Sequence, residues 1–228
     1  MDPAHVFWEG QSLGGILGTI NVAVNPKISE AVLNVPGGTF ADIAITSPAF
    51  AQSILDLLAA IPPPQGPIVQ GTPAFLQFLQ VTKWVFDPAE PINFAGHLIG
   101  DATHPTLPNL LAPGTVQAPK SVLGQLAVCD ATVPNAFNLL LFNVAGLVPG
   151  TAPNQFQTFK NTSTPVANGF CQALPSPWDT GAVAHGFLLD HGLPAGDLNN
   201  NQLSQEARNF AAAFLADPTV VQPQLDAK

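Results

Sequence analysis

Short apolar runs separated by glycine- and proline-rich turns divide the start of the chain into a strand, a helix and a second strand. Residues 5–9, with Val6-Phe7-Trp8 at their centre, are a candidate strand, and residues 13–24 have the length and apolar content of a buried helix. Residues 30–35 form the second apolar run, which ends at a Pro-Gly-Gly turn. Because one helix lies between the two strands, this unit predicts parallel pairing with a right-handed crossover.

Residues 39–119 have a different pattern, because they show no strand alternation. Helical runs are predicted at 48–60, at 73–86 and at 93–99, with prolines between them. A helical segment placed between two strands of a sheet predicts a lid or cap inserted into the domain. The alternative is that these are ordinary amphipathic helices that pack on the sheet.

The remaining residues return to the alternation of strands and helices. A third strand is predicted at 122–129, a helix from 135 to about 147, a shorter strand at 155–160 and a final helix at 202–215. These elements predict one α/β domain over residues 1–228, with a short, mostly parallel sheet, flanking helices and the helical insertion.

The stretch Gly10-Gln11-Ser12-Leu13-Gly14 lies between the first predicted strand and the first predicted helix. A G-x-S-x-G turn in this position is typical of a nucleophile elbow. We expect Gly10 and Gly14 to lie where a Cβ would collide with a neighbouring element. The backbone N–H of Leu13, at the helix N-terminus, could then stabilise an oxyanion formed by attack of Ser12. The alternative is a glycine-rich packing turn.

Acyl transfer by a serine also needs a base and an acid that orients it, which follow in the order Ser, Asp/Glu, His in α/β-hydrolases. Asp130 comes directly after the third predicted strand, where the catalytic groups of parallel sheets gather; the alternative is that it caps the next helix. His185 is the first choice for the base and His191 is its rival. His97 and His104 precede Asp130, within the predicted lid, and do not fit this order.

A pair of carboxylates, Asp87 and Glu90, lies in the same insertion. Paired carboxylates can act as acid and base in glycoside hydrolysis. Nothing else in the sequence points to that chemistry, so we interpret both as turn and cap residues.

Composition excludes several classes of partner. The net charge of −9 argues against nucleic acid, and charged residues make up only 9% of the 228 residues. No apolar run is long enough to span a membrane, and the first residues lack the pattern of a signal peptide. We expect no metal or cofactor, because no Cys/His spacing suggests zinc. Cys129 and Cys171 fit either one disulfide or two buried thiols.

Several segments, taken in order along almost the whole chain, resemble bacterial α/β-hydrolases of the extracellular lipase and virulence-factor lipase type. They are Gly-Gln-Ser-Leu-Gly-Gly-Ile-Leu-Gly-Thr, Ala-Val-Leu-Asn-Val-Pro-Gly-Gly, Phe-Asp-Pro-Ala-Glu-Pro-Ile-Asn-Phe-Ala, Asp-Ala-Thr-Val-Pro-Asn and His-Gly-Phe-Leu. The resemblance implies an esterase or lipase with Ser12 as nucleophile, Asp130 as acid and His185 as base. It also implies that residues 39–119 include the lid that shapes the acyl pocket.

The sequence departs from this family at its start. Such enzymes have several strands before the elbow, and one of those early loops supplies the second oxyanion N–H. The chain therefore resembles the C-terminal half to two-thirds of the fold, a truncated α/β-hydrolase. The elbow strand would be an exposed edge, and a homodimer that pairs through residues 5–9 is one way to cover it.

These observations lead to three functional hypotheses. The first is a serine esterase or lipase that acts on apolar acyl or aromatic esters, with an ester or lipid as its small-molecule partner. The second is a catalytically silent remnant, or half of a split or oligomeric enzyme. The third is a polyester depolymerase that uses the same three residues. The sequence does not distinguish acyl chain length or oligomeric state.

Overall fold

The structure is a computed structural model that describes residues 6–161, 185–189, 198–221 and 225–227 of the chain. Its strands are β1 (Val6–Gln11), β2 (Ile28–Asn34), β3 (Ser121–Ala127), β4 (Val148–Pro149), β5 (Gln155–Asn161) and β6 (Leu225–Ala227). They form one sheet in the order β1-β2-β3-β5-β4, and β6 also pairs with β5. Every one of these pairings is parallel. The prediction of an α/β fold with a mostly parallel sheet is therefore confirmed.

The helices agree with the predicted ones most closely where the sequence carries clear end signals. They are α1 (Leu13–Val24), α2 (Phe40–Thr46), α3 (Ala51–Ala59), α4 (Pro73–Phe86), α5 (Ile92–Ala95), α6 (Asn135–Ala145) and α7 (Leu198–Ala216), with two 3₁₀ turns, η1 (Asp87–Ala89) and η2 (Phe187–Leu189). The bounds of α1 and α4 match the predicted ranges. Helix α2 was not predicted, and the helix predicted at 93–99 corresponds to the single turn of α5.

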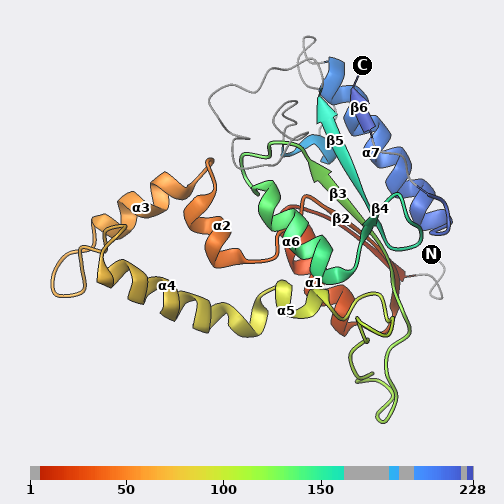
Figure 1. Ribbon diagram of the computed structural model, residues 1–228, viewed down its shortest axis with the longest axis horizontal. Coiled ribbons are helices and arrows are strands. Elements are labelled where there is room, and N and C mark those ends of the chain that lie inside the picture. Colours follow the sequence, from red (N-terminus) through yellow and green to blue (C-terminus); the bar gives the residue numbers. More distant parts are fainter. Residues whose placement is uncertain (1–5, 162–184, 190–197, 222–224, 228) are drawn as a thin grey trace.

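Helices cover both faces of the sheet, α1, α5 and α6 on one side and α7 on the other (Figure 1). The alternating side chains of β2 supply both cores. Leu33 packs in the cluster with Phe142 of α6, and the adjacent Val32 packs in the cluster with Phe214 of α7. A parallel strand that is buried on both faces in this way appears in the sequence as a continuous apolar run.

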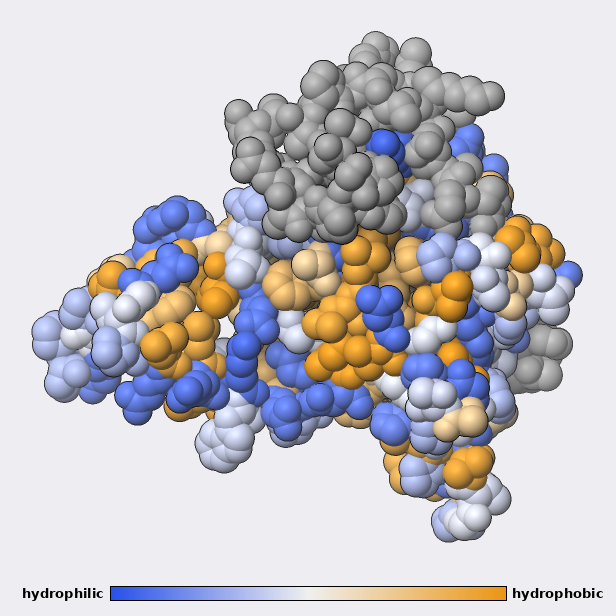
Figure 2. All heavy atoms as spheres, in the orientation of Figure 1, coloured by the Kyte–Doolittle hydropathy of each residue, from blue (hydrophilic) through white to orange (hydrophobic). Residues whose placement is uncertain are grey.

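Helices α2, α3 and α4 form an arm that stands out to one side of the sheet (Figure 1). The arm helices pack mainly on one another, since α2 contacts both α3 and α4. Apolar side chains remain on the surface of α4, and Trp84 is 76% exposed. Figure 2 shows apolar residues on the arm and again in the middle of this face, in the region of α5 and α6. The role of the arm as a lid stays a prediction.

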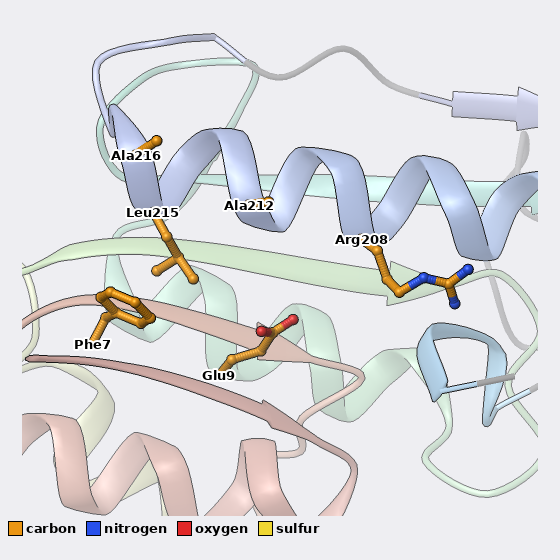
Figure 3. Close-up of a pocket in the computed structure, with 6 residues that line it drawn as sticks. All are labelled: Phe7, Glu9, Arg208, Ala212, Leu215 and Ala216. Atoms are coloured by element: carbon orange, nitrogen blue, oxygen red, sulfur yellow. The ribbon is translucent and has the colours of Figure 1, made fainter. Parts of the chain in front are cut away.

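Strand β1 lies at the edge of the described sheet. Phe7 and Glu9 project from it towards α7 and line a cavity of about 480 Å³ together with residues of that helix (Figure 3). Phe7 is 51% exposed. Pairing of this edge with a second copy of the chain stays a prediction. Among the described residues, no helix is long and apolar enough to cross a membrane.

A buried lysine ties β3 to the turn between α1 and β2. Lys120 is 3% exposed, and its Nζ donates hydrogen bonds to the carbonyl oxygens of Asn25, at 2.9 Å, and Ile28, at 2.6 Å. Desolvation by burial lowers the pKa of Lys120 below its ordinary value. The ammonium group therefore satisfies two carbonyls of the turn that leads into the second strand.

We expect Lys120→Met to reduce the free energy of unfolding by about 1–3 kcal/mol, because it leaves buried carbonyl groups without a donor. Urea denaturation at neutral pH measures this change. The matched control is Lys27→Met at an exposed lysine of the same turn, which should change the free energy of unfolding by less than about 0.5 kcal/mol. Equal effects of the two substitutions would contradict a structural role for Lys120.

The pH dependence of this difference has a definite sign. Because the folded-state pKa of Lys120 is lowered, the unfolded chain binds more protons than the folded chain between the two pKa values. The contribution of Lys120 to the free energy of unfolding therefore rises with pH between these two pKa values. We expect the stability advantage of wild type over Lys120→Met to grow as the pH is raised towards the ordinary lysine value. A stability advantage that stays constant or shrinks as the pH rises would contradict the lowered pKa of Lys120.

Candidate active site

Ser12 occupies a strained turn between β1 and α1. Its backbone has φ 56° and ψ −119°, a conformation that non-glycine residues rarely adopt. Hydrogen bonds on both sides hold it there. Its N–H donates to the carbonyl of Asn34 on β2 at 2.9 Å, and its own carbonyl accepts from the N–H groups of Gly15 and Ile16. The turn is therefore fastened both to the next strand and to the first turn of the helix.

Glycines close to Ser12 in the sequence permit this close packing. The predicted pair was Gly10 and Gly14. A Cβ on Gly10 would lie 2.3 Å from the carbonyl oxygen of Gly14, and one on Gly18 would lie 2.3 Å from Nε1 of Trp8. A Cβ on Gly15 would be 3.0 Å from the carbonyl oxygen of Asn34. The expectation for Gly10 holds, but that for Gly14 is wrong, because a Cβ there meets nothing within 4 Å.

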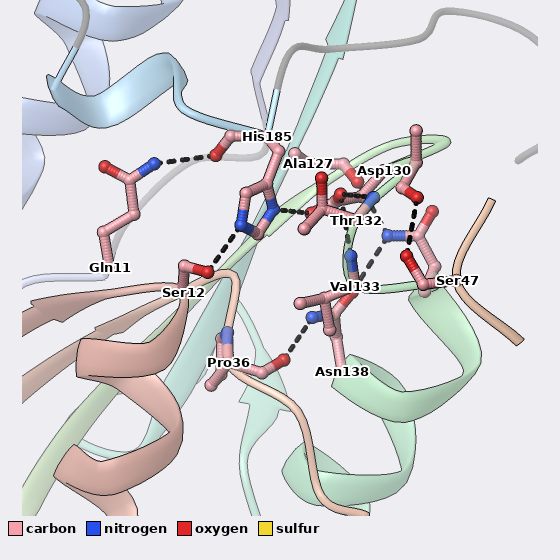
Figure 4. Close-up of polar contacts among 12 residues, drawn as sticks. Gln11, Ser12, Pro36, Ser47, Ala127, Asp130, Thr132, Val133, Asn138 and His185 are labelled. Atoms are coloured by element: carbon pink, nitrogen blue, oxygen red, sulfur yellow. Dashed lines mark hydrogen bonds and ion pairs between the residues drawn. The ribbon is translucent and has the colours of Figure 1, made fainter. Parts of the chain in front are cut away.

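His185 lies between Ser12 and Asp130 and contacts both (Figure 4). Its Nε2 is 2.6 Å from Oγ of Ser12, and its Nδ1 is 2.6 Å from Oδ2 of Asp130. A neutral imidazole with its proton on Nδ1 donates to the carboxylate and accepts from the serine hydroxyl. The backbone of the histidine is also held, because Nε2 of Gln11 donates to its carbonyl oxygen at 2.8 Å.

The second oxygen of the Asp130 carboxylate is used within its own loop. Oδ1 accepts hydrogen bonds from the N–H groups of Thr132, at 2.7 Å, and Val133, at 3.0 Å. The side chain is fully buried. These contacts aim the remaining oxygen, Oδ2, at the imidazole. Asp130 thus caps its own turn with one oxygen and faces His185 with the other.

Two asparagines of α6 support the Asp130 loop, and neither was predicted as a site residue. Asn135 accepts from the N–H of Cys129 at 2.7 Å and donates to the carbonyl of Ala127 at 2.7 Å and to Oδ1 of Asn138 at 3.0 Å. Asn138 donates in turn to the carbonyl of Pro36, after β2. Both side chains are buried. The only sequence signal was the position of two amides one helical turn apart, just after the predicted acid.

Cys129 precedes Asp130 with φ 58°, and it is disulfide-bonded. The chain has one other cysteine, Cys171, which lies outside the described residues. A covalent link at Cys129 restrains the same loop that the Asn135 amide holds. Of the two states that the sequence allowed, the disulfide is the one present.

Two of the other histidines, His97 and His104, have partners outside this cluster. Nδ1 of His97 lies 2.7 Å from the carbonyl oxygen of Pro105, and His104 pairs with Asp101 at 2.9 Å. Hydrogen bonds from His104 are the main reason that the pKa of Asp101 is lowered. His191 lies outside the described residues.

Glu90 and Asp87 have structural partners. The buried carboxylate of Glu90 accepts from the N–H of Phe40, at 2.7 Å, and from that of Ala41, at 3.4 Å, and so caps the start of α2. Oδ1 of Asp87 lies 3.2 Å from Nδ2 of Asn93. Within the described ranges no group of three or more His, Cys, Asp or Glu side chains could hold a metal ion.

The three side chains that meet here are a serine, a histidine and an aspartate, the residue types that can act as nucleophile, base and orienting acid in acyl transfer. Leu13, the predicted oxyanion donor, opens α1, and the first N–H groups of a helix have no acceptor within the helix. The cluster has the parts needed for nucleophilic attack on a carbonyl carbon. The catalytic roles of Ser12, His185, Asp130 and Leu13 stay predictions.

Comparison with known proteins identifies no family for this chain. No model of a known protein family matches the sequence, and no curated protein is similar to it. Among solved structures, one match is the acylaminoacyl peptidase of Pyrococcus horikoshii, with 10% identity and a TM-score of 0.48. The match covers 98% of this chain and 25% of the peptidase, so the chain spans about a quarter of the length of that enzyme.

Substitution of Gly10 tests the packing of the elbow. We expect Gly10→Ala to destabilise the fold by at least about 1–3 kcal/mol, because its Cβ would overlap backbone atoms of α1. Gly14→Ala is the matched control, since the same methyl group meets open space and alanine favours a helix over glycine by about 1 kcal/mol. Thermal unfolding of both variants checks this. Equal destabilisation by the two substitutions would contradict the described elbow.

Proposed function

We propose that the protein is a serine hydrolase that cleaves carboxylic esters with apolar acyl or aromatic groups. The observation that carries the proposal is the position of His185, with one ring nitrogen 2.6 Å from Ser12 Oγ and the other 2.6 Å from Asp130. These residues are far apart in the sequence, and each is held by further hydrogen bonds. Such an arrangement is expected of an activated nucleophile.

In the proposed reaction, Ser12 Oγ attacks the ester carbonyl while His185 Nε2 takes its proton. The oxygen of the tetrahedral intermediate accepts a hydrogen bond from the N–H of Leu13. The intermediate collapses to an acyl-enzyme when His185 returns the proton to the leaving alcohol. Water then attacks the acyl-enzyme by the same route and releases the acid. Asp130 stabilises the imidazolium that forms in each half of the reaction.

The surroundings of Ser12 favour an apolar substrate. Leu13 and Leu17, on the first turns of α1, are both more than half exposed, although apolar side chains usually lie inside. The resemblance of the motifs to extracellular lipases supports an ester over a peptide. A polyester depolymerase would use the same three residues, and a silent remnant would keep the fold without the reaction.

Hydrolysis of p-nitrophenyl butyrate tests the proposal. We expect the wild-type chain to release p-nitrophenol and Ser12→Ala to lower kcat/KM by at least about 10³-fold, because the nucleophile is removed. Asp130→Asn should lower kcat by about 10⁴-fold, because His185 would then adopt the wrong tautomer. Ser53→Ala, at an exposed serine of α3, is the control and should retain full activity. Activity that survives in Ser12→Ala would contradict the assignment, and an inactive but folded wild type would favour the silent remnant.

A further inference from the structure

A small apolar pocket begins at the residue that follows Ser12. Its lining residues are Leu13, Ile16, Leu17, Phe40, Phe86, Ala89 and Pro91. Ile16 and Leu17 follow Leu13 by about one helical turn on the same side of α1, which starts directly after Ser12. The pocket therefore extends along α1 away from the reacting serine, between the body of the molecule and the base of the arm.

Two aromatic rings form part of the opposite wall, and a buried carboxylate outside the lining holds one of them in place. The rings of Phe40 and Phe86 pack with their centroids 5.4 Å apart. Glu90 accepts the backbone N–H of Phe40 at 2.7 Å, which holds the first turn of α2 next to the Ala89–Pro91 turn. The Glu90 carboxylate thus helps to fix the wall in place from outside the pocket, and every side chain that lines the pocket is apolar.

The volume of the pocket limits what it can hold. It measures about 150 Å³, and an engineered cavity of about that size lined by Leu, Ile and Phe binds benzene. A six-carbon apolar group is thus close to the largest that it encloses. An acyl chain joined to the carbonyl at Ser12 would fill the pocket at about six carbons, and further methylene groups would extend into solvent.

We propose that this pocket is the acyl-binding site and that it selects short acyl groups of up to about six carbons. The inference rests on the proposed ester hydrolysis at Ser12 and deepens it by naming the acyl group. Each methylene group that becomes buried should raise kcat/KM by about threefold to fourfold. The gain should stop when the pocket is full.

The test is kcat/KM for p-nitrophenyl esters from acetate to dodecanoate. For the wild type we expect a rise of at least tenfold from acetate to hexanoate, and no further rise beyond octanoate. Leu17→Trp, which fills the pocket from an exposed position on α1, should lower the hexanoate-to-acetate ratio at least tenfold. Phe86→Ala, which removes one wall, should move the maximum to longer chains.

The ratio of the kcat/KM values for two substrates, measured on one protein sample, does not depend on the fraction of active chains. Partial misfolding of a variant therefore cannot imitate the result. Leu110→Trp is the matched control, because Leu110 is 77% exposed and lies outside the pocket; its ratio should equal that of the wild type. A wild-type profile that still rises at dodecanoate, or an unchanged ratio in Leu17→Trp, would overturn the pocket assignment while ester hydrolysis stands. Failure of the wild type to hydrolyse any of the esters would overturn the proposed function instead.

Discussion

The hydrogen bond from Nδ1 of His185 to the buried carboxylate of Asp130 is the contact on which the site depends. It sets the tautomer of the imidazole, and so leaves Nε2 as an acceptor for the hydroxyl of Ser12. The other oxygen of Asp130 accepts hydrogen bonds from backbone N–H groups of its own loop, which orient the carboxylate for this contact. Loss of either set of hydrogen bonds would leave a buried carboxylate poorly paired.

The ends of three neighbouring strands supply the rigid frame for this contact. Ser12, Val35 and Cys129 follow β1, β2 and β3, and all three have positive φ values. Strained backbone of this kind persists when the surrounding structure holds it. Here the hydrogen bond from Ser12 to Asn34, the Asn135–Asn138 amide pair and the disulfide at Cys129 hold it. The sheet and its first loops act as one unit that positions Ser12 and Asp130.

Local sequence signals predicted local structure well. The length and end signals of the first helix defined α1, and Thr72-Pro73 marks the start of α4, where Thr72 caps the helix. Short elements carry too few residues for a pattern, so α2, β4 and β6 were missed. The error at Gly14 has a different cause, because which glycine faces a neighbouring backbone depends on how α1 is rotated against β1 and β2.

The candidate site was predictable only as an ordered set of residues. Three signals predicted the three side chains. They are the G-x-S-x-G turn, an aspartate directly after a strand, and a histidine later in the chain. Their meeting is a contact between residues 173 positions apart, which no local pattern encodes. Gln11 and Asn138 were missed for the same reason, since their hydrogen-bond partners are backbone carbonyls more than 100 positions away. The apolar pocket likewise depends on the packing of the arm against α1.

The most direct measurement is covalent labelling of the folded chain with a fluorophosphonate, followed by intact mass and peptide mapping. Such a reagent reacts with a serine hydroxyl that a neighbouring base activates. We expect one label for each chain, carried by Ser12, and much slower labelling in His185→Ala. A folded chain that takes up no label, or that is labelled at another residue, would contradict the central claim that His185 activates Ser12.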